Sequence, residues 1–278
     1  MTDKRKIVYL IISLAILIFL LISVYNNVVS VKRANSILTK EMESIAEKNK
    51  VPVFTLQKVV LYSSAEYEDL SAEQNLQDVS IHQYTDLAIY IRNNEDDDGS
   101  LRSKNTEYEL TEENTISELY IDEIKLVSDY DIGTKLINYK SPLDMGKYRT
   151  IDNTIERIDY KILHKNEENK NDYSEPTFFT DCSNPITLSV LNKNVLEHCT
   201  ANNDGTLKLD GSILKNAGVE PEKLNTKISF KIHLKNNLNE EFVANVVVDN
   251  EIDETIYEGF KMEVFSASDL DVKFFKKL

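Results

Sequence analysis

The sequence predicts a mainly β protein, in which an N-terminal transmembrane and stalk α-helix precedes an antiparallel β-sandwich of the immunoglobulin-like or jelly-roll-like kind. Three observations support this prediction. Residues 7–25 form an uncharged apolar run, apolar residues recur with a two-residue period beyond residue 51, and no long helical pattern interrupts them. Many short strands without intervening long helices favour a sandwich over a βαβ sheet.

The apolar run 7–25, IVYLIISLAILIFLLISVY, contains nineteen uncharged residues and no helix breaker. At about 1.5 Å per residue, a helix of this length is roughly 28 Å long, close to the ~30 Å hydrocarbon core of a bilayer. Tyr9 and Tyr25 stand near its ends, and basic residues precede it. A cleaved signal peptide is the alternative, but no small-residue cleavage site and no nearby cysteine that accepts a lipid follow the run.

We therefore expect a single-pass protein of the cell membrane, with a cytoplasmic tail at 1–6, a span in the lipid bilayer at 7–25, and an extracytoplasmic domain at 51–278. Residues 1–25 carry a charge of +2 from Lys4, Arg5, Lys6 and Asp3, so a chain of net charge −15 leaves −15 − 2 = −17 for the remainder. A body this acidic argues against a nucleic-acid partner, which requires a basic surface. Solubility is a sufficient reason for the charge.

Residues 26–50 are expected to continue the helix as a juxtamembrane stalk. Between residues 24 and 45, six apolar residues and one Asn are spaced alternately four and three positions apart, as in a heptad seam: Val24, Val28, Val31, Asn35, Leu38, Met42 and Ile45. A seam of this kind predicts a homo-oligomer through residues 24–45. The alternative is a single helix that packs the same stripe on its own β-domain, since about three heptads are the minimum for a coiled coil.

The strands expected beyond residue 51 cover residues 53–63, 79–92, 115–128, 155–163, 185–191, 256–265 and 271–275. Residues 227–248 predict a β-hairpin, because apolar residues alternate on both sides of the polar turn NNLN at 236–239. Short helices are expected at 65–76, capped by Ser64, and at 210–218, between Asp210 and Gly218. The polar run at 166–176 is either a long loop or a boundary between two subdomains.

Motifs for catalysis and for cofactor binding are missing from the sequence. Seven glycines leave little material for a phosphate-binding loop, and neither hydrolase nor zinc-protease signatures occur. We therefore predict no catalytic residues, no cofactor and no enzymatic activity. Four widely separated histidines show no metal-ligand spacing: His82, His164, His198 and His233. The last lies opposite Ile232 and Leu234 in the expected hairpin, which predicts exposure to solvent.

One acidic segment resembles half of a calcium loop. In NEDDDGSLRSKN at 94–105, the residues Asn94, Asp96, Asp98 and Gly99 occupy ligand positions 1, 3, 5 and 6. The twelfth position is Asn105, where an EF-hand requires a bidentate Glu, and strands rather than helices are expected on both sides. A solvated acidic loop is the alternative to a calcium site.

Two cysteines, Cys182 and Cys199, bracket CSNPITLSVLNKNVLEHC. In an oxidising compartment they would close this loop as a disulfide, worth ~3 kcal/mol on a chain-entropy estimate; two separate thiols are the alternative. Four tyrosines lie in the expected strands: Tyr62, Tyr84, Tyr90 and Tyr120. Their position allows two interpretations, because they either fill the core of a protein without Trp or face outward as contact residues.

The segment FFTDCSNPITLSVLNKN and the overall layout resemble uncharacterised membrane-anchored proteins of low-GC Gram-positive bacteria. This resemblance implies no site residues. The sequence as a whole predicts a binding or structural component of the cell envelope with a protein partner there. A pilin-like or secretion-apparatus subunit is an alternative, although the prepilin processing signal is missing. A cell-wall-active enzyme, with a site assembled from distant residues, is the second alternative.

Overall fold

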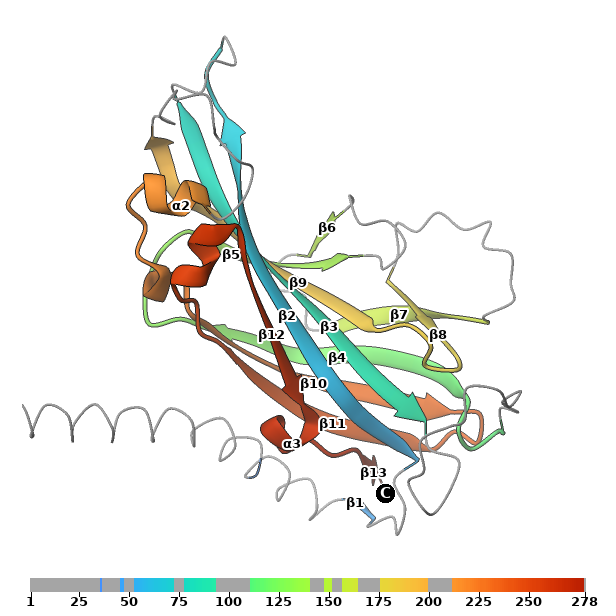
Figure 1. The fold of residues 1–278 in the computed structure, drawn as a ribbon. Coiled ribbons are helices and arrows are strands. Elements are labelled where there is room, and N and C mark those ends of the chain that lie inside the picture. Colours follow the sequence, from blue (N-terminus) through green and yellow to red (C-terminus); the bar gives the residue numbers. More distant parts are fainter. Residues whose placement is uncertain are drawn as a thin grey trace, which may run out of the picture.

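The computed structural model describes residues 53–72, 78–93, 111–140, 148–151, 157–164, 176–199 and 212–277, together with Ser36, Ala46 and Glu47. These residues form a mainly β structure of two sheets (Figure 1). The seven-stranded sheet has the order β1-β13-β11-β10-β4-β7-β8, and the six-stranded sheet has the order β12-β2-β3-β9-β5-β6. The described strands pair antiparallel except for β7 with β8, which pair parallel.

The first seven strands are β1 (Ala46–Glu47), β2 (Phe54–Asp69), β3 (Val79–Asn93), β4 (Ile116–Val127), β5 (Thr134–Lys140), β6 (Tyr148–Ile151) and β7 (Arg157–Leu163). The others are β8 (Thr177–Phe179), β9 (Ile186–Cys199), β10 (Thr226–Asn236), β11 (Glu241–Asn250), β12 (Phe260–Ser266) and β13 (Phe275–Lys277). The helices are short: α2 (Ser212–Asn216), η1 (Pro221–Leu224), η2 (Glu254–Glu258) and α3 (Ala267–Leu270).

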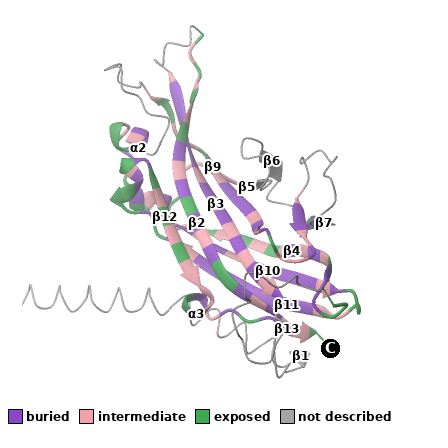
Figure 2. Ribbon diagram, turned by 45° about the vertical axis from the view of Figure 1, so that its right-hand side comes forward, coloured by how far each residue is buried: buried purple, intermediate pink, exposed green. Residues whose placement is uncertain are grey.

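The two sheets share one apolar core, because alternate side chains of each sheet point toward the other. Phe54 and Ile89 come from the six-stranded sheet, while Ile121 and Phe242 come from the seven-stranded sheet. The rings of Phe54 and Phe242 meet edge to face, with centroids 5.1 Å apart. Figure 2 shows the resulting bands of buried residues along the central strands.

A second, smaller apolar cluster lies where β2 and β3 extend beyond the main core. It joins Ile81 of β3 to Leu214 of α2 and Ile256 of η2. Between the two clusters, the buried side chains of Ser63, Thr85 and Asn250 bond to one another at 2.9–3.4 Å. These bonds satisfy polar groups whose burial would otherwise be costly.

The hairpin predicted over 227–248 is confirmed. β10 and β11 pair from Thr226↔Asn250 to Lys235↔Glu241. The turn is built by Asn236, whose Oδ1 accepts the backbone N–H groups of Leu238 and Glu240. An Asn side chain that bonds its own turn in this way favours the reversal of the chain.

The helix expected at 65–76 is wrong over its first five residues, because β2 continues to Asp69. Ala65 is fully buried in the smaller apolar cluster, and the ladder with β3 continues to Asp69↔Val79. Tertiary pairing thus outweighs the local helical pattern. Three other strands differ from their predicted bounds. β9 runs to Cys199 rather than 191, and β12 begins at Phe260 because η2 occupies residues 254–258. β13 occupies Phe275–Lys277, so the strand predicted at 271–275 is right only at its last residue.

The span expected at 7–25 and the tail at 1–6 lie outside the described residues, as does all of the stalk except Ser36, Ala46 and Glu47. No helix within the described part combines the length and apolar character that a membrane span requires. Ala46 and Glu47 pair with Lys277 and Lys276 of β13, so the end of the expected stalk is a strand. The strands on either side of 166–176, β7 and β8, are parallel neighbours in one sheet.

Candidate functional site

The outer face of the seven-stranded sheet carries a charged and aromatic cluster centred on His233. Its members, the His233 cluster, are Tyr120 and Asp122 of β4, Arg157 of β7, His233 of β10, Glu241 of β11 and Lys277 of β13. Because β13, β11, β10, β4 and β7 are consecutive neighbours in the sheet, residues far apart in the chain meet in one row across it.

His233 joins three strands through its two ring nitrogens. Nδ1 lies 2.9 Å from Glu241 Oε1, and Nε2 lies 3.0 Å from Asp122 Oδ1. Each ring nitrogen thus lies within hydrogen-bonding distance of a carboxylate oxygen, one on β11 and one on β4. Only 7% of His233 is exposed to solvent. The predicted face of His233 was right, but the predicted exposure is wrong.

Aromatic and cationic groups cover the imidazole. The ring of Tyr120 is stacked on His233, with a centroid separation of 4.3 Å and an interplanar angle of 9°. On the other side of the Tyr120 ring, Arg157 Cζ lies 3.5 Å from the centroid. Arg157 also donates to Glu118 Oε1 at 3.1 Å and to Asp159 Oδ1 at 2.7 Å. Cation–π contact and paired charges therefore hold the ring stack in place.

The surroundings perturb two titrating groups of the cluster. Burial and the nearby Glu241 carboxylate raise the pKa of Tyr120 to about 12. Burial alone would raise the pKa of Glu241, but hydrogen bonds from His233 and Lys277 outweigh it and lower that pKa below its usual value. The cluster thus keeps Tyr120 as a neutral phenol and Glu241 as a carboxylate.

The arrangement suits cohesion of the sheet better than proton transfer. A general base needs an available lone pair within reach of a substrate. Both nitrogens of His233 already face carboxylate oxygens at 2.9 and 3.0 Å, and one face of its ring is stacked on Tyr120. The aromatic and Arg side chains on the rim are types enriched at protein interfaces.

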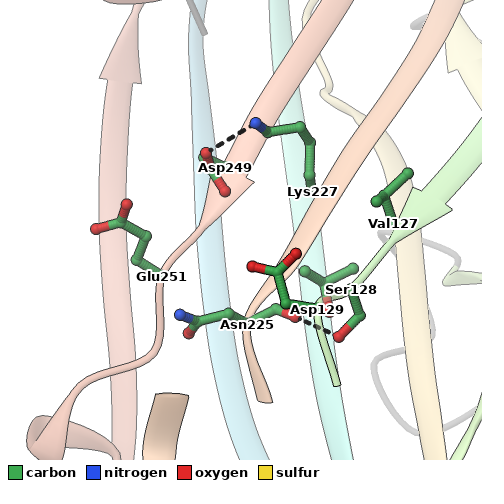
Figure 3. Close-up of a pocket in the computed structure, with 8 residues that line it drawn as sticks. Val127, Ser128, Asp129, Asn225, Lys227, Asp249 and Glu251 are labelled. Atoms are coloured by element: carbon green, nitrogen blue, oxygen red, sulfur yellow. Dashed lines mark hydrogen bonds and ion pairs between the residues drawn. The ribbon is translucent and has the colours of Figure 1, made fainter. Parts of the chain in front are cut away.

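A shallow pocket lies at one end of the same sheet, where β4 ends, β10 begins and β11 ends (Figure 3). Its volume is about 130 Å³, smaller than the several hundred Å³ typical of small-molecule sites. Lys227 Nζ pairs with Asp249 at 3.3 Å, and Ser128 Oγ donates to the carbonyl of Asn225 at 2.8 Å. The pocket has room for water or a small ion, and its lysine is already paired.

A third surface feature is an apolar row on β12, the edge strand of the six-stranded sheet. Phe260, Met262 and Val264 point outward with 51%, 60% and 54% of their surface exposed. Tyr62 of β2 lies beside them, and its ring stacks on Phe260 with a centroid separation of 5.1 Å. We call these four residues the β12 row.

The predicted calcium ligands, Asn94, Asp96 and Asp98, lie outside the described residues. In the described part of the chain, no group of three His, Cys, Asp or Glu side chains is arranged to hold a metal ion. His198 instead pairs with Asp78 at 3.0 Å, and the thiol of Cys199 donates to the carbonyl of Val79 at 3.3 Å. Burial raises the pKa of the Cys199 thiol, which disfavours the thiolate that a metal requires.

Cys182 and Cys199 are thiols rather than halves of a disulfide. Cys199 is the last residue of β9 (Ile186–Cys199), while Cys182 precedes its first residue by four positions. Cys199 pairs with Val79 and Ile186 with Ile89, so at about 3.3 Å per residue of β3 the two ends of β9 are roughly 33 Å apart, whereas a disulfide needs Cα atoms within about 7 Å. Pairing of these two cysteines within one chain therefore does not fit the geometry.

The sequence contained a partial signal for the His233 cluster. The predicted hairpin already placed His233 near Glu241 on one face. The register of β10 against β4, which brings Tyr120 opposite His233, depends on long-range pairing that a single sequence does not reveal. Of the four strand tyrosines, Tyr62 is exposed and Tyr84, Tyr90 and Tyr120 are half-buried, so these side chains do not fill the core; their role as contact residues stays a prediction.

Comparisons with protein-family models, curated proteins and solved structures find no match to this chain.

Proposed function

We propose that this chain is a membrane-anchored protein of the cell envelope, whose extracytoplasmic β-domain binds other proteins and has no catalytic activity. In this proposal residues 7–25 anchor the chain in the bilayer, residues 26–50 form the stalk, and the two sheets form an immunoglobulin-like or jelly-roll-like sandwich. The apolar run and the basic residues before it support the anchor. The acidic body is suited to remaining dissolved outside the lipid.

The β12 row is the observation on which the binding role rests. Four large apolar or aromatic side chains lie together on one outward face, where a solitary domain gains nothing from exposing them. Contiguous exposed apolar surface with a polar surround marks protein contact sites. Lys58, which pairs with Ser266 at the end of β12, places a charge beside the row, as at the rim of an interface.

Site-specific photocrosslinking in living cells tests the binding role. A photoreactive phenylalanine derivative replaces Met262 in the full-length chain, and the matched control carries it at Leu238, which is 47% exposed at the tip of the other sheet's hairpin. We expect irradiation to give covalent protein adducts from position 262 and none from position 238. Absence of any adduct from 262, with the chain folded and in the membrane fraction, refutes the proposal.

The membrane topology has its own test. Protease added to intact, wall-stripped cells is expected to digest residues 51–278 and to leave the tail and span with the membrane. Full protection of the β-domain until the membrane is dissolved would place it on the other side and contradict the proposed orientation.

A further inference from the structure

The edge strand β12 has an inverted polarity. Its apolar residues Phe260, Met262 and Val264 face outward, while Lys261 and Glu263 lie opposite Ser63 and Leu61 on the core-facing side. Only 12% of the Lys261 side chain is exposed, and its Nζ lies 3.4 Å from Glu263 and 3.7 Å from Asp253. A strand that serves only as the end of its own sheet would show the opposite pattern.

One side of β12 is also open. β12 pairs with β2 on one side, and no strand of the described part pairs with its other side. Figure 2 shows β12 at the margin of its sheet, with exposed and half-buried residues alternating along it. Backbone donors and acceptors on such an edge are available to a further strand.

We propose that two copies of this chain join through β12, in antiparallel pairing with a twofold axis at Met262. This inference rests on the proposed binding role of the β12 row and names its partner as a second copy. The pairing makes one continuous sheet from the two six-stranded sheets. It sets Met262 opposite Met262 of the second copy, and Phe260 opposite Val264 of the second copy.

The charges select this register. With the axis at Met262, Lys261 of each copy lies opposite Glu263 of the other, so both cross-strand pairs have opposite charges. With the axis at Lys261 or at Glu263, two identical charges face each other, which destabilises an antiparallel pair. The sequence Phe-Lys-Met-Glu-Val is thus complementary to itself in one antiparallel alignment.

The same charges explain why the partner is a copy of this chain and not any extended peptide. An inward-pointing charge on an edge strand disfavours pairing with unrelated strands, because the added strand would have to place one of its own side chains beside that charge. Lys261 is such a charge. A second β12 places its Glu263 carboxylate opposite Lys261, in addition to the Glu263 and Asp253 of the same chain, and it supplies an apolar face that continues the β12 row.

Cysteine crosslinking in membranes that contain the full-length chain tests the register. Met262→Cys is expected to form a disulfide-linked dimer under mild oxidation, whereas Val264→Cys is not. In the proposed alignment the two copies of residue 264 are four residues apart along the strands, about 13 Å, which exceeds the reach of a disulfide. The double variant Phe260→Cys/Val264→Cys is expected to crosslink, and the chain without added cysteine controls for Cys182 and Cys199.

Charge exchange between two chains gives an independent test. Lys261→Glu alone and Glu263→Lys alone are each expected to reduce dimer recovery at least tenfold, because like charges then face each other. A mixture of the two variants is expected to restore a heterodimer, since every cross-strand pair is again Lys with Glu. A purely intrachain role for the Lys261–Glu263 pair predicts no recovery on mixing.

The outcomes separate this inference from the proposed function. If residue 262 gives photoadducts only with other proteins and Met262→Cys gives no dimer, the binding role stands and the second copy is wrong. If Met262→Cys and Val264→Cys crosslink equally, the copies meet by another route, such as the stalk, and the register is wrong. If residue 262 gives neither adducts nor dimers, both proposals fall.

Discussion

Replacement of His233 by Ala is expected to destabilise the domain by about 3 kcal/mol. The substitution removes two hydrogen bonds to charged groups, worth about 1.5–3 kcal/mol each, and one aromatic stack worth about 0.5–1.5 kcal/mol. Asp122 and Glu241 have 26% and 30% of their side chains exposed, so water replaces part of the lost bonding. We therefore expect less than the full sum, with the melting temperature about 6–12 °C lower.

Thermal and urea unfolding of the domain measure this loss, with His198→Ala as the matched control. His198 also faces one carboxylate, Asp78 at 3.0 Å, but 74% of its side chain is exposed. An exposed pair of this kind contributes about 0–1 kcal/mol. If His233→Ala and His198→Ala unfold within about 2 °C of each other, the cluster does not hold its strands together and the argument for cohesion is wrong.

Three further predictions concern the pH dependence of stability at Glu241, the two glycines Gly133 and Gly218, and the buried Asn250. Because the pKa of Glu241 is lowered on folding, its contribution is present above its ordinary pKa of 4.5 and is lost as the pH falls through the folded value. Urea unfolding of Glu241→Gln should therefore show a smaller loss of stability between about pH 5 and pH 3 than the parent chain. Gly133 has φ +65°, and an added Cβ would lie 2.3 Å from Asn192 Oδ1, whereas Gly218 has φ +73° with nothing within 4 Å. Gly133→Ala should cost clearly more than the roughly 1–2 kcal/mol of backbone strain expected for Gly218→Ala, and equal melting temperatures would contradict the close contact. Asn250→Ala should cost about 1–3 kcal/mol by breaking the polar layer with Ser63 and Thr85, while Asn237→Ala in the exposed hairpin turn should change the melting temperature little.

Local patterns were sufficient to predict most strands of this domain. The alternation in β3, β10 and β11 is visible in the sequence because each strand buries one face in the main core. The same reasoning failed at Ala65, where a helical pattern continued into residues that pair with β3. Nothing local distinguishes these residues from a helix, since their strand state depends on β3 and on the packing of α2 and η2.

The candidate sites were less predictable than the fold, because they depend on which strands are neighbours. His233 and Glu241 are close in sequence, but Asp122, Tyr120 and Arg157 reach them only through the order β10-β4-β7. A histidine opposite apolar residues looks solvent-exposed when its neighbouring strands are unknown. In the same way, the alternation in β12 predicts a strand, while only its place at the sheet edge reveals that the apolar side faces outward.

The free energy of the β12 pairing indicates whether the dimer would form in solution or only in the membrane-anchored chain. Cross-strand contact buries part of the exposed halves of Phe260, Met262 and Val264, which is worth at most about 1 kcal/mol each, or roughly 6 kcal/mol for two copies. Association costs about 4–15 kcal/mol in lost motion, so strand hydrogen bonds and the Lys261–Glu263 pairs must supply the remainder. Such a balance gives a weak dimer for a dissolved domain. An anchor at 7–25 would raise the local concentration of the chain, and linked units bind far more tightly than separate ones. The pairing should consequently be strong in the membrane-bound chain and much weaker in residues 51–278 alone, a difference that the Met262→Cys crosslink measures directly.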